Sequence, residues 1–304
     1  MSTHKKYKKV SDDDTRCAPN IKYMDGSCFS LDQLIKISES YNKNNTDKII
    51  ISNNKLELVK QLNNKLSKIC STQTCWLKLD FVKALEDDEI NEYTLRPKGP
   101  KGQYEWLSTV HINDVVAQYH NKYEDFLFLG AVPYDFEDLP LLGLCDIDFD
   151  ELLQDNKVKI GIVINLDEHY KSGSHWVALY TDLLKGQVYY FDSYGIKPKK
   201  RIKKCITKIV KFLFKNKYNK NLHINKYLKN DSKNIKVLEK KLKNFDIRFN
   251  QVRHQFKNSE CGVYSINFIL RLAKGETFDD ITNNITYDDD INKCREVYFV
   301  NKLT

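Results

Sequence analysis

A glutamine lies six residues before a cysteine in the segment Gln255–Ser265, and the cysteine begins an apolar, helix-like run. A helix N-terminus carries about half a positive charge, which stabilises a thiolate relative to a thiol. The thiolate is the form that attacks carbonyl carbons, and an amide such as that of Gln255 can hydrogen-bond the oxyanion that develops. Gln255 and Cys261 therefore predict one half of a cysteine-protease site, which still needs a histidine and an acid.

A predicted β-hairpin supplies both missing groups. Strand-like runs over 175–183 and 186–192 are joined by the turn signal Leu-Lys-Gly at 184–186. A hairpin folded symmetrically about the start of this turn places His175 directly opposite Asp192. Opposed residues of antiparallel strands share a face, with Cβ atoms about 5 Å apart, so the carboxylate can hold the imidazole in one tautomer and stabilise its charged form.

Each of these residues also has a common structural role when it is taken alone. His175 could be an ordinary residue at the start of a strand, and Asp192 could begin a turn. Cys261 could be a buried core thiol. His254 lies nearer to Cys261 along the chain, but no acid accompanies it. The combination is far more specific than any one of its members.

The motifs around these residues resemble those of the Ulp1/SUMO-protease-like cysteine proteases, the clan that includes the adenovirus protease. The matching segments are Gly173–Ala178, Tyr190–Gly195 and Gln255–Tyr264. Within the clan, Arg253–Gln255 and Glu260–Gly262 are most similar to the branch found in large DNA viruses, typified by the polyprotein-processing protease of African swine fever virus. The resemblance covers about residues 101–304.

The resemblance implies a role for each residue of the motifs. Cys261 is then the nucleophile, His175 the general base and Asp192 the residue that orients the histidine. Gln255 forms the oxyanion hole together with the backbone N–H of Cys261. Trp176 would border a narrow channel that admits only glycines, although core packing is an equally good explanation for this side chain. No metal is implied.

The implied function is cleavage after Gly-Gly-type sites, with processing of structural or core precursor proteins during virion maturation. An enzyme of this kind is expected in the host cytoplasm, at the virus factory, and inside the virion. A deubiquitinase or deSUMOylase acting on host conjugates is an alternative with the same chemistry. No cofactor is expected, although DNA or a peptide stays open as an activator.

A third hypothesis, of another class, comes from the charge distribution. The chain has a net charge of +8, but residues 197–243 alone contain 18 Lys or Arg and two acidic residues. Such a density suits non-specific binding of nucleic acid, so the chain could be a nucleic-acid-binding scaffold. Lysines on solvated helix faces, in a chain rich in Lys and Asn throughout, explain the block equally well.

Composition along the chain predicts three regions. Residues 1–20 are polar and charged and predict a disordered tail. Residues 21–96 carry apolar residues at helical spacing and predict a helical arm, which weakly resembles SAP-like nucleic-acid-binding modules. A Pro- and Gly-rich break at 96–102 marks the boundary at which the predicted catalytic domain, residues 97–304, begins.

The second half of the chain predicts an α+β fold. Strand signals lie at 159–165, 175–180, 186–192 and 245–252, and one or two amphipathic helices occupy the lysine-rich block. Strands and helices do not alternate strictly, which excludes a doubly wound sheet. The family resemblance implies a mixed sheet flanked by helices.

Cysteine usage and hydropathy limit the environment of the chain. The eight cysteines are scattered without a secretory signal, which favours reduced thiols in a cytosolic compartment. Cys70 and Cys75 could form half of a zinc site, but no second pair of ligands lies nearby. No apolar run reaches the length of about 18 residues that a membrane-spanning helix needs, so no membrane partner is expected.

Overall fold

The computed structural model describes residues 16–87, 90, 94–142, 147–222 and 240–300 of the chain, and these form two compact units. Unit 1 holds the described residues up to Lys101 together with those from Glu296, and unit 2 runs from Gly102 to Arg295. The predicted catalytic domain, 97–304, thus differs from unit 2 at both ends. In unit 1 the N–H of Val300 donates to the carbonyl of Pro97 (2.9 Å), which ties the end of the described chain to the Pro/Gly-rich segment.

Unit 1 is helical, as the apolar spacing predicts. Its helices are α1 (Leu31–Asn44), α2 (Lys55–Leu66), α3 (Gln73–Trp76) and α4 (Asp80–Lys83). The helix α1 begins with a capping box, in which Ser30 and Gln33 each accept a hydrogen bond from the other's backbone N–H. The helices enclose a core of fully buried apolar side chains that includes Phe29, Leu34, Ile37, Leu58, Leu62 and Trp76.

The predicted disordered tail cannot extend to residue 20. Residues 1–15 lie outside the described residues, but Cys17 and Ala18 are buried. The N–H of Ala18 donates to the carbonyl of Thr94 (3.1 Å), and Cys17 forms an isolated β-bridge with Leu95. Long-range pairing of this kind leaves no local signal in a polar sequence, which explains why composition placed the boundary too late.

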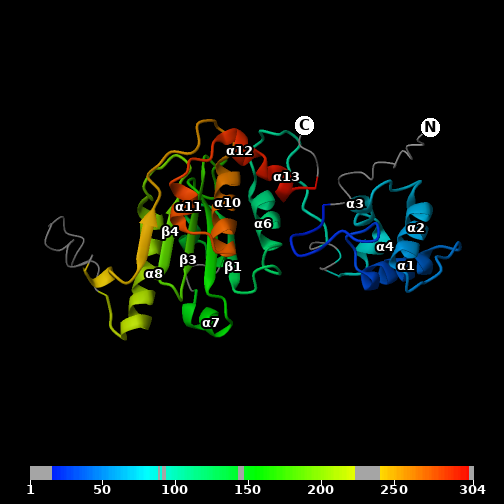
Figure 1. Ribbon diagram of the computed structural model, residues 1–304, viewed down its shortest axis with the longest axis horizontal. Helices are drawn as coiled ribbons and strands as arrows, with labels where there is room; N and C mark the ends of the chain where they lie inside the picture. The colour runs from blue at the N-terminus through cyan, green and yellow to red at the C-terminus, as the bar shows by residue number, and fades with distance from the viewer. Residues whose placement is uncertain (1–15, 88–89, 91–93, 143–146, 223–239, 301–304) are drawn as a thin grey trace, which may run out of the picture. The chain divides into compact units, whose positions relative to one another are not determined.

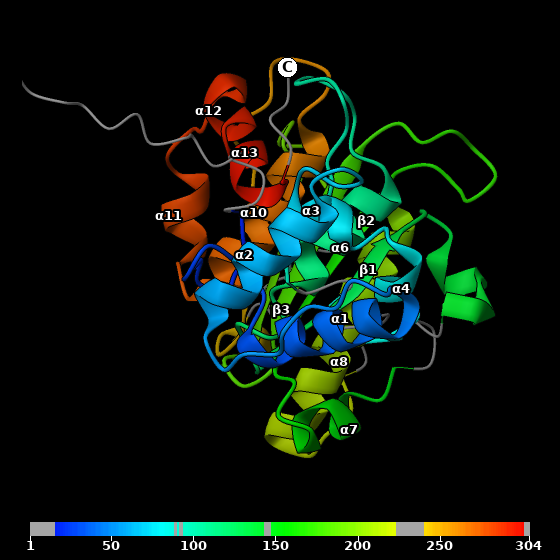
Figure 2. The same cartoon turned by 90° about the vertical axis from the view of Figure 1, so that its right-hand side faces the viewer.

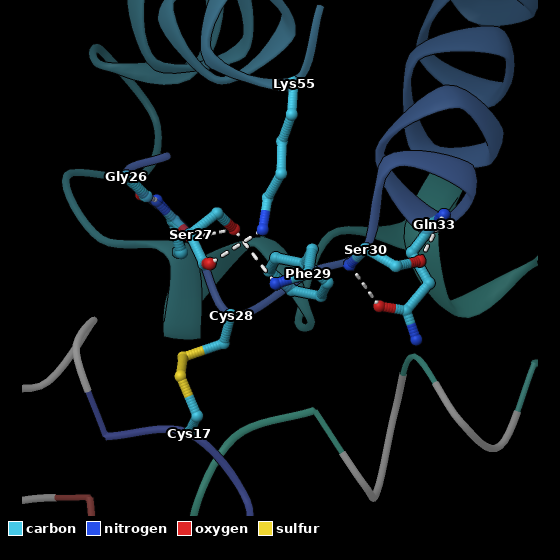
Figure 3. Close-up of a disulfide and its surroundings, with 9 residues drawn as sticks. Cys17, Gly26, Ser27, Cys28, Phe29, Ser30, Gln33 and Lys55 are labelled. Carbon is cyan, nitrogen blue, oxygen red and sulfur yellow. Dashed lines mark hydrogen bonds between the residues drawn. A yellow bond between two sulfur atoms is a disulfide. The ribbon is translucent and has the colours of Figure 1, made fainter. Parts of the chain in front are cut away.

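The prediction of reduced thiols is wrong for four cysteines of unit 1. Disulfides join Cys17 to Cys28 and Cys70 to Cys75, with Cα separations of 5.3 Å and 5.5 Å. Figure 3 shows the first of them beneath Ser27, whose carbonyl accepts from the ammonium of Lys55 (3.1 Å). Cα separations in this range allow a disulfide without backbone movement. The half zinc site considered for Cys70 and Cys75 is likewise excluded, because the two sulfurs are bonded to each other.

Unit 2 is built on a mixed sheet with the strand order β1-β2-β3-β4-β5. The antiparallel pairs are β2 with β3 and β3 with β4, and the parallel pairs at the two edges are β1 with β2 and β4 with β5. The apolar stretch that starts at Phe126, which carries no strand assignment from the sequence, forms β1. The strands are β1 (Phe126–Val132), β2 (Lys159–Asn165), β3 (Trp176–Asp182), β4 (Gln187–Phe191) and β5 (Asp246–Phe249).

Helices cover both faces of this sheet, so the predicted α+β arrangement of a mixed sheet flanked by helices is confirmed (Figure 1). The helix α8 (Lys200–Tyr218) packs on one face through Ile202, Ile209 and Leu213. The helix α10 (Cys261–Lys274) packs on the other. A Cβ atom on Gly161 of β2 would lie 2.7 Å from Ile269 of α10, so only glycine permits this close approach.

Shorter helices complete unit 2. In both views α11 (Phe278–Thr282) and α12 (Asp288–Asn292) lie beside α10 (Figures 1 and 2). The helix α6 (Thr109–Ala117) contacts β1 and α10. Further elements among the described residues are α7 (Phe149–Gln154), the 3-10 turns η2 (Phe136–Asp138) and η3 (Pro140–Leu142), and α13 (Cys294–Tyr298), which spans the boundary between the units along the chain.

The β3–β4 hairpin differs from its predicted register by two residues. Asp182 pairs with Gln187 and Ala178 with Phe191, and this register continues to Val177, not His175, opposite Asp192. A shift by one residue would send the two side chains to opposite faces, but a shift by two keeps them on the same face. His175 and Asp192 are therefore diagonal neighbours rather than direct partners.

The lysine-rich block contains the helix α8, which carries the apolar residues that predicted one or two amphipathic helices there, and residues 223–239 of the block lie outside the described ones. The strand predicted at 245–252 is shorter, because β5 ends at Phe249 and the chain then turns toward the Gln255 segment. Within the parts of the chain that the structure describes, no helix combines the length and apolarity needed to cross a membrane.

Candidate active site

Cys261 is the first residue of α10, as its sequence position predicts. Apolar residues on both sides of the helix, including Val263, Ile266 and Phe268, are fully buried and anchor it against the sheet. Only 2% of Cys261 is exposed. The N–H groups of the first helical turn, which have no partner within the helix, lie near the thiol.

His175 and Asp192 meet at the edge of the sheet where β3 begins and β4 ends. The Nε2 atom of His175 lies 2.7 Å from Oδ1 of Asp192, and the aspartate is completely buried. The same oxygen accepts from the N–H of Tyr194 (2.9 Å). The side-chain amide of Asn250 brackets Asp192 by accepting from its N–H and donating to its carbonyl, each at 2.8 Å. These contacts leave the carboxylate little freedom to turn.

The thiol of Cys261 also acts on the imidazole of His175, so one ring interacts with both the acid and the thiol. Since Nε2 faces Asp192, the other ring nitrogen, Nδ1, is the one available to the sulfur. Burial by itself lowers the pKa of His175, but the hydrogen bonds and negative charges of Asp192 and Cys261 raise it from 6.5 to about 9. The site thus favours an imidazolium at His175 at neutral pH.

Gln255 is fully buried near this pair and makes two side-chain hydrogen bonds. Its Oε1 accepts from the hydroxyl of Ser193 (2.6 Å), and its Nε2 donates to the carbonyl of Lys257 (2.8 Å). The turn after Asp192 brings Ser193 to Gln255. Gly195 has φ +71°, and a Cβ there would lie 3.0 Å from the carbonyl oxygen of Gln251, so glycine lets the two segments approach.

A stack of side chains supports the exposed side of His175. The ring of Tyr194 lies parallel to the imidazole, with centroids 4.7 Å apart. The guanidinium of Arg253 lies 5.2 Å from the centre of the Tyr194 ring and donates from Nε to the carbonyl of Gln255 (2.7 Å). The electron-rich face of Tyr194 attracts a positively charged imidazole, so the stack also favours the imidazolium.

A buried ion pair lies directly beside the candidate nucleophile. Glu260, the N-cap of α10, pairs with Arg295 (3.0 Å), and neither side chain is more than 1% exposed. Asn292 and Ser259 each donate to the same carboxylate at 2.9 Å. Without Arg295 the charge of Glu260 would oppose a thiolate at Cys261. The pair therefore keeps the start of α10 compatible with a negatively charged sulfur.

Trp176 reaches the start of α10 through Leu107. It is 6% exposed, and its indole N–H donates to the carbonyl of Leu107 (2.9 Å). A Cβ atom on Gly262 would lie 3.0 Å from the Leu107 side chain, so these residues lie close together beside Cys261. This arrangement is compatible both with core packing and with one wall of a narrow channel.

Two other histidines are held apart from Cys261. His254 is buried, its Nδ1 accepts from the N–H of Thr286 (3.3 Å), and burial lowers its pKa. His169 bonds to Asp135 (2.6 Å), a second His–Asp pair that the sequence patterns did not reveal. Among the described residues no group of three or more His, Cys, Asp or Glu side chains is arranged to hold a metal ion.

Sequence patterns also missed the residues that hold the four predicted ones in place. Ser193 and Tyr194 directly follow Asp192, so the motif Asp-Ser-Tyr-Gly contained a signal for both. Asn250 and Arg295 carried none, because their partners lie 58 and 35 residues away along the chain.

Comparison with known proteins identifies the family. Residues 150–302 match the C-terminal catalytic domain of the Ulp1 protease family. The chain is 35% identical over 295 residues to a thiol protease of Acanthamoeba polyphaga mimivirus, covering 91% of this chain and 90% of that protein. It is 22% identical over 276 residues to the SUMO-1 cysteine protease of African swine fever virus, covering 84% and 92% of the two chains.

The fold of a solved relative agrees with these matches. The crystal structure of the African swine fever virus protease superposes with a TM-score of 0.62 at 19% identity, over 96% of this chain and 97% of that one. The motifs at Gly173–Ala178, Tyr190–Gly195 and Gln255–Tyr264 all fall within the matched family region. This chain therefore belongs to the Ulp1 family of cysteine proteases.

Proposed function

We propose that Cys261, His175 and Asp192 are the catalytic residues of this cysteine endopeptidase and that Gln255 contributes to its oxyanion hole. The observation that supports this assignment best is the position of His175, which hydrogen-bonds a fully buried carboxylate and interacts with the thiol at the start of a helix. A core histidine with a structural role has no need of a thiol partner.

The proposed mechanism is acyl transfer. The thiolate of Cys261 attacks the scissile carbonyl carbon, and the N–H of Cys261 and the amide of Gln255 stabilise the oxyanion. The imidazolium of His175 gives its proton to the departing amine as the C–N bond breaks, which leaves a thioester. Neutral His175 then takes a proton from water, whose oxygen attacks the thioester carbon. The C–S bond breaks, which releases the carboxylic acid product and restores the Cys261 thiolate beside the imidazolium.

The proposed cleavage site follows Gly-Gly. The nucleophile is 2% exposed, and Trp176, Leu107 and Gly262 crowd the chain around it. A substrate can reach such a thiol only as a slim backbone, and residues without side chains fit this requirement. The same argument applies to viral precursors and to ubiquitin-like proteins, so it indicates the sequence at the cleavage site but not the substrate protein that contains it.

Virion maturation is the proposed biological setting, with structural or core precursors as substrates in the host cytoplasm, at the virus factory, and in the virion interior. The viral origin of the two curated relatives supports this setting. A deubiquitinase or deSUMOylase is the alternative, which is consistent with the name of the second relative, a SUMO-1 cysteine protease.

The decisive experiment compares the two substrate classes. Candidate viral core precursors are incubated with the wild type and with Cys261→Ala, and new termini are identified by mass spectrometry. In parallel the wild type is exposed to ubiquitin and SUMO probes that carry an electrophile at the C-terminal glycine. Precursor fragments ending in Gly-Gly support maturation, whereas rapid probe labelling with uncut precursors supports the alternative.

Gln255→Ala should slow turnover strongly without unfolding the protein. Loss of one oxyanion donor typically lowers kcat by about 10²- to 10³-fold. Turnover of a Gly-Gly peptide is measured alongside thermal unfolding, and Gln251→Ala, on the exposed part of the same segment, is the control. Wild-type kcat in Gln255→Ala would remove this residue from the oxyanion hole.

The helix α8 supports a second, separate activity, non-specific binding of nucleic acid. Lysines recur at every third or fourth position of α8 and form a stripe along one side of the helix. The helix contains no acidic residue. Lys204 is paired with Glu137 (2.8 Å), but most of the stripe faces solvent. DNA bound here could act as an activator or confine the enzyme to packaged particles. The stripe consists of Lys200, Lys204, Lys208, Lys211 and Lys215.

Charge reversal tests this activity. Replacing Lys200, Lys211 and Lys215 with Glu should weaken duplex binding and flatten its salt dependence, because each lost phosphate contact reduces the slope of log K against log salt by about 0.9. The control reverses Lys122, Lys185 and Lys274, which lie on other elements. Equal losses in both triple variants would mean that net charge, rather than the α8 stripe, attracts the DNA.

A further inference from the structure

Ser193 connects the acid and the amide of the active site. The side chain is 1% exposed, and its hydroxyl donates to Oε1 of Gln255 (2.6 Å). Its carbonyl accepts from the N–H groups of His254 (2.8 Å) and Gln255 (2.9 Å). Ser193 also follows Asp192 directly. Of these two consecutive residues, the first carries the carboxylate that contacts His175, and the second hydrogen-bonds the carboxamide of Gln255.

The two hydrogen bonds of Gln255 determine which way its carboxamide faces. A backbone carbonyl can only accept, so the atom 2.8 Å from the Lys257 carbonyl must be Nε2. The remaining oxygen then faces Ser193, whose hydroxyl can donate. Nε2 carries two hydrogens and the Lys257 carbonyl takes one. The second N–H is left for a further acceptor.

We propose that Ser193 is a positioning residue for the oxyanion hole, and that it acts by holding and polarising the Gln255 carboxamide. This inference rests on the proposed role of Gln255. Donation to Oε1 draws electron density toward the oxygen and makes the N–H groups of the same amide stronger donors. The same hydrogen bond also resists rotation of the Gln255 amide away from the scissile carbonyl group of a bound substrate. Ser193 itself touches no substrate.

A purely structural role for Ser193 predicts different results. A hydroxyl that only satisfies a buried amide contributes to folding, and its loss lowers stability without a selective effect on the chemical step. A hydroxyl that positions the oxyanion donor changes kcat, leaves the KM of the substrate nearly constant and has no effect once Gln255 is removed. It also leaves the reactivity of the Cys261 thiolate unchanged, because alkylation forms no oxyanion.

The test is a double-mutant cycle with three readouts. Ser193→Ala, Gln255→Ala and the double variant are compared for kcat and KM on a fluorogenic Gly-Gly peptide, for the rate of Cys261 alkylation by iodoacetamide, and for thermal unfolding. We expect Ser193→Ala to lower kcat about 10-fold or more, within the effect of a lost oxyanion donor. KM and the alkylation rate should stay within about twofold, and the double variant should match Gln255→Ala.

Several outcomes would overturn the proposal. Wild-type kcat in Ser193→Ala, or an equal further loss in the Gln255→Ala background, would show that the two residues act independently. A parallel fall in alkylation would mean that Ser193 acts on His175 and Asp192 instead. If Ser193→Ala does not fold, Ser193→Cys keeps the shape with a weaker donor, and unchanged kcat in that variant contradicts the proposal.

Failure of this inference is distinguishable from failure of the proposed function. A slow Gln255→Ala combined with a normal Ser193→Ala removes only Ser193 from the oxyanion hole. A normal Gln255→Ala removes the oxyanion role itself and the inference with it.

Discussion

Cys261→Ala is expected to abolish peptide-bond cleavage while the protein still folds. Loss of the nucleophile in proteases of this mechanistic type lowers kcat by about 10⁵-fold or more, because no other group can form the acyl intermediate. Removal of one sulfur atom from a helix anchored by many buried apolar side chains should cost little stability. Single-turnover cleavage of a Gly-Gly peptide, with thermal unfolding measured on the same samples, checks both halves of the prediction.

The chain offers matched controls for this prediction. Cys205 and Cys294 are the other cysteines among the described residues that form no disulfide, and both are partly buried. Burial, with a smaller contribution from Glu137, raises the pKa of the Cys205 thiol to about 12, so it should resist alkylation at neutral pH. Cys205→Ala and Cys294→Ala should therefore cleave at close to the wild-type rate. Residual activity in Cys261→Ala, or its loss in either control, would point to another nucleophile.

The hairpin shows how far sequence alone could place the catalytic pair. Alternation and the turn signal identified the two strands, and parity then put His175 and Asp192 on one face. The exact register depended on where the turn is centred, and the centre was placed one residue too early: Asp182 pairs with Gln187, so the hairpin is centred between residues 184 and 185. The error was harmless because an even shift preserves the face and the imidazole can reach a diagonal partner.

Long-range partners marked the limit of sequence reasoning. The disulfide from Cys17 to Cys28, the bracket that Asn250 forms around Asp192, and the pairing of Glu260 with Arg295 all require knowledge of which distant segments pack together. No periodicity or local composition contains that information. The residues that carry the chemistry were predictable because their motifs are local, whereas the residues that hold them rigid were not.

The Glu260–Arg295 pair has a further consequence for how the site is assembled. Removing one partner of a buried ion pair typically costs about 3–5 kcal/mol, since it leaves a charge without compensation. The environment of the thiol therefore depends on Arg295, at the very end of unit 2, although Arg295 lies 35 residues from Glu260 along the chain.

Asp192→Ala is expected to lower kcat/KM by about 10³- to 10⁴-fold, the usual effect of losing the acid that orients a catalytic histidine. Its removal takes away the hydrogen bond and charge that favour the imidazolium, so the pKa of His175 falls below its wild-type value of about 9. The alkaline decline of kcat/KM, which follows loss of the imidazolium proton, should move to lower pH. A pH profile of kcat/KM between 6 and 10 measures this shift.

Asp192→Asn separates orientation from charge. Oδ1 of Asp192 makes both contacts, to Nε2 of His175 and to the N–H of Tyr194, while Oδ2 has no partner among the described residues. An asparagine can keep its oxygen at the first position and put its NH₂ at the second, so the imidazole stays oriented and only the charge is lost. Its kcat/KM should be no lower than that of Asp192→Ala, with the pKa of His175 still lowered.

Folding stability should respond to the same proton. Because the folded pKa of His175 lies above its unfolded value of 6.5, the contribution of the bound proton is fully present below pH 6.5 and is lost as the pH rises through about 9. The difference in unfolding temperature between the wild type and Asp192→Asn should therefore narrow across this window. The matched control for the kinetic predictions is Asp135→Ala, which removes the acid from the other His–Asp pair.

Two results would show that Asp192 does not govern the charge of His175. One is a loss of kcat/KM in Asp135→Ala as large as that in Asp192→Ala, and the other is an alkaline decline of kcat/KM that stays at the wild-type pH in Asp192→Ala.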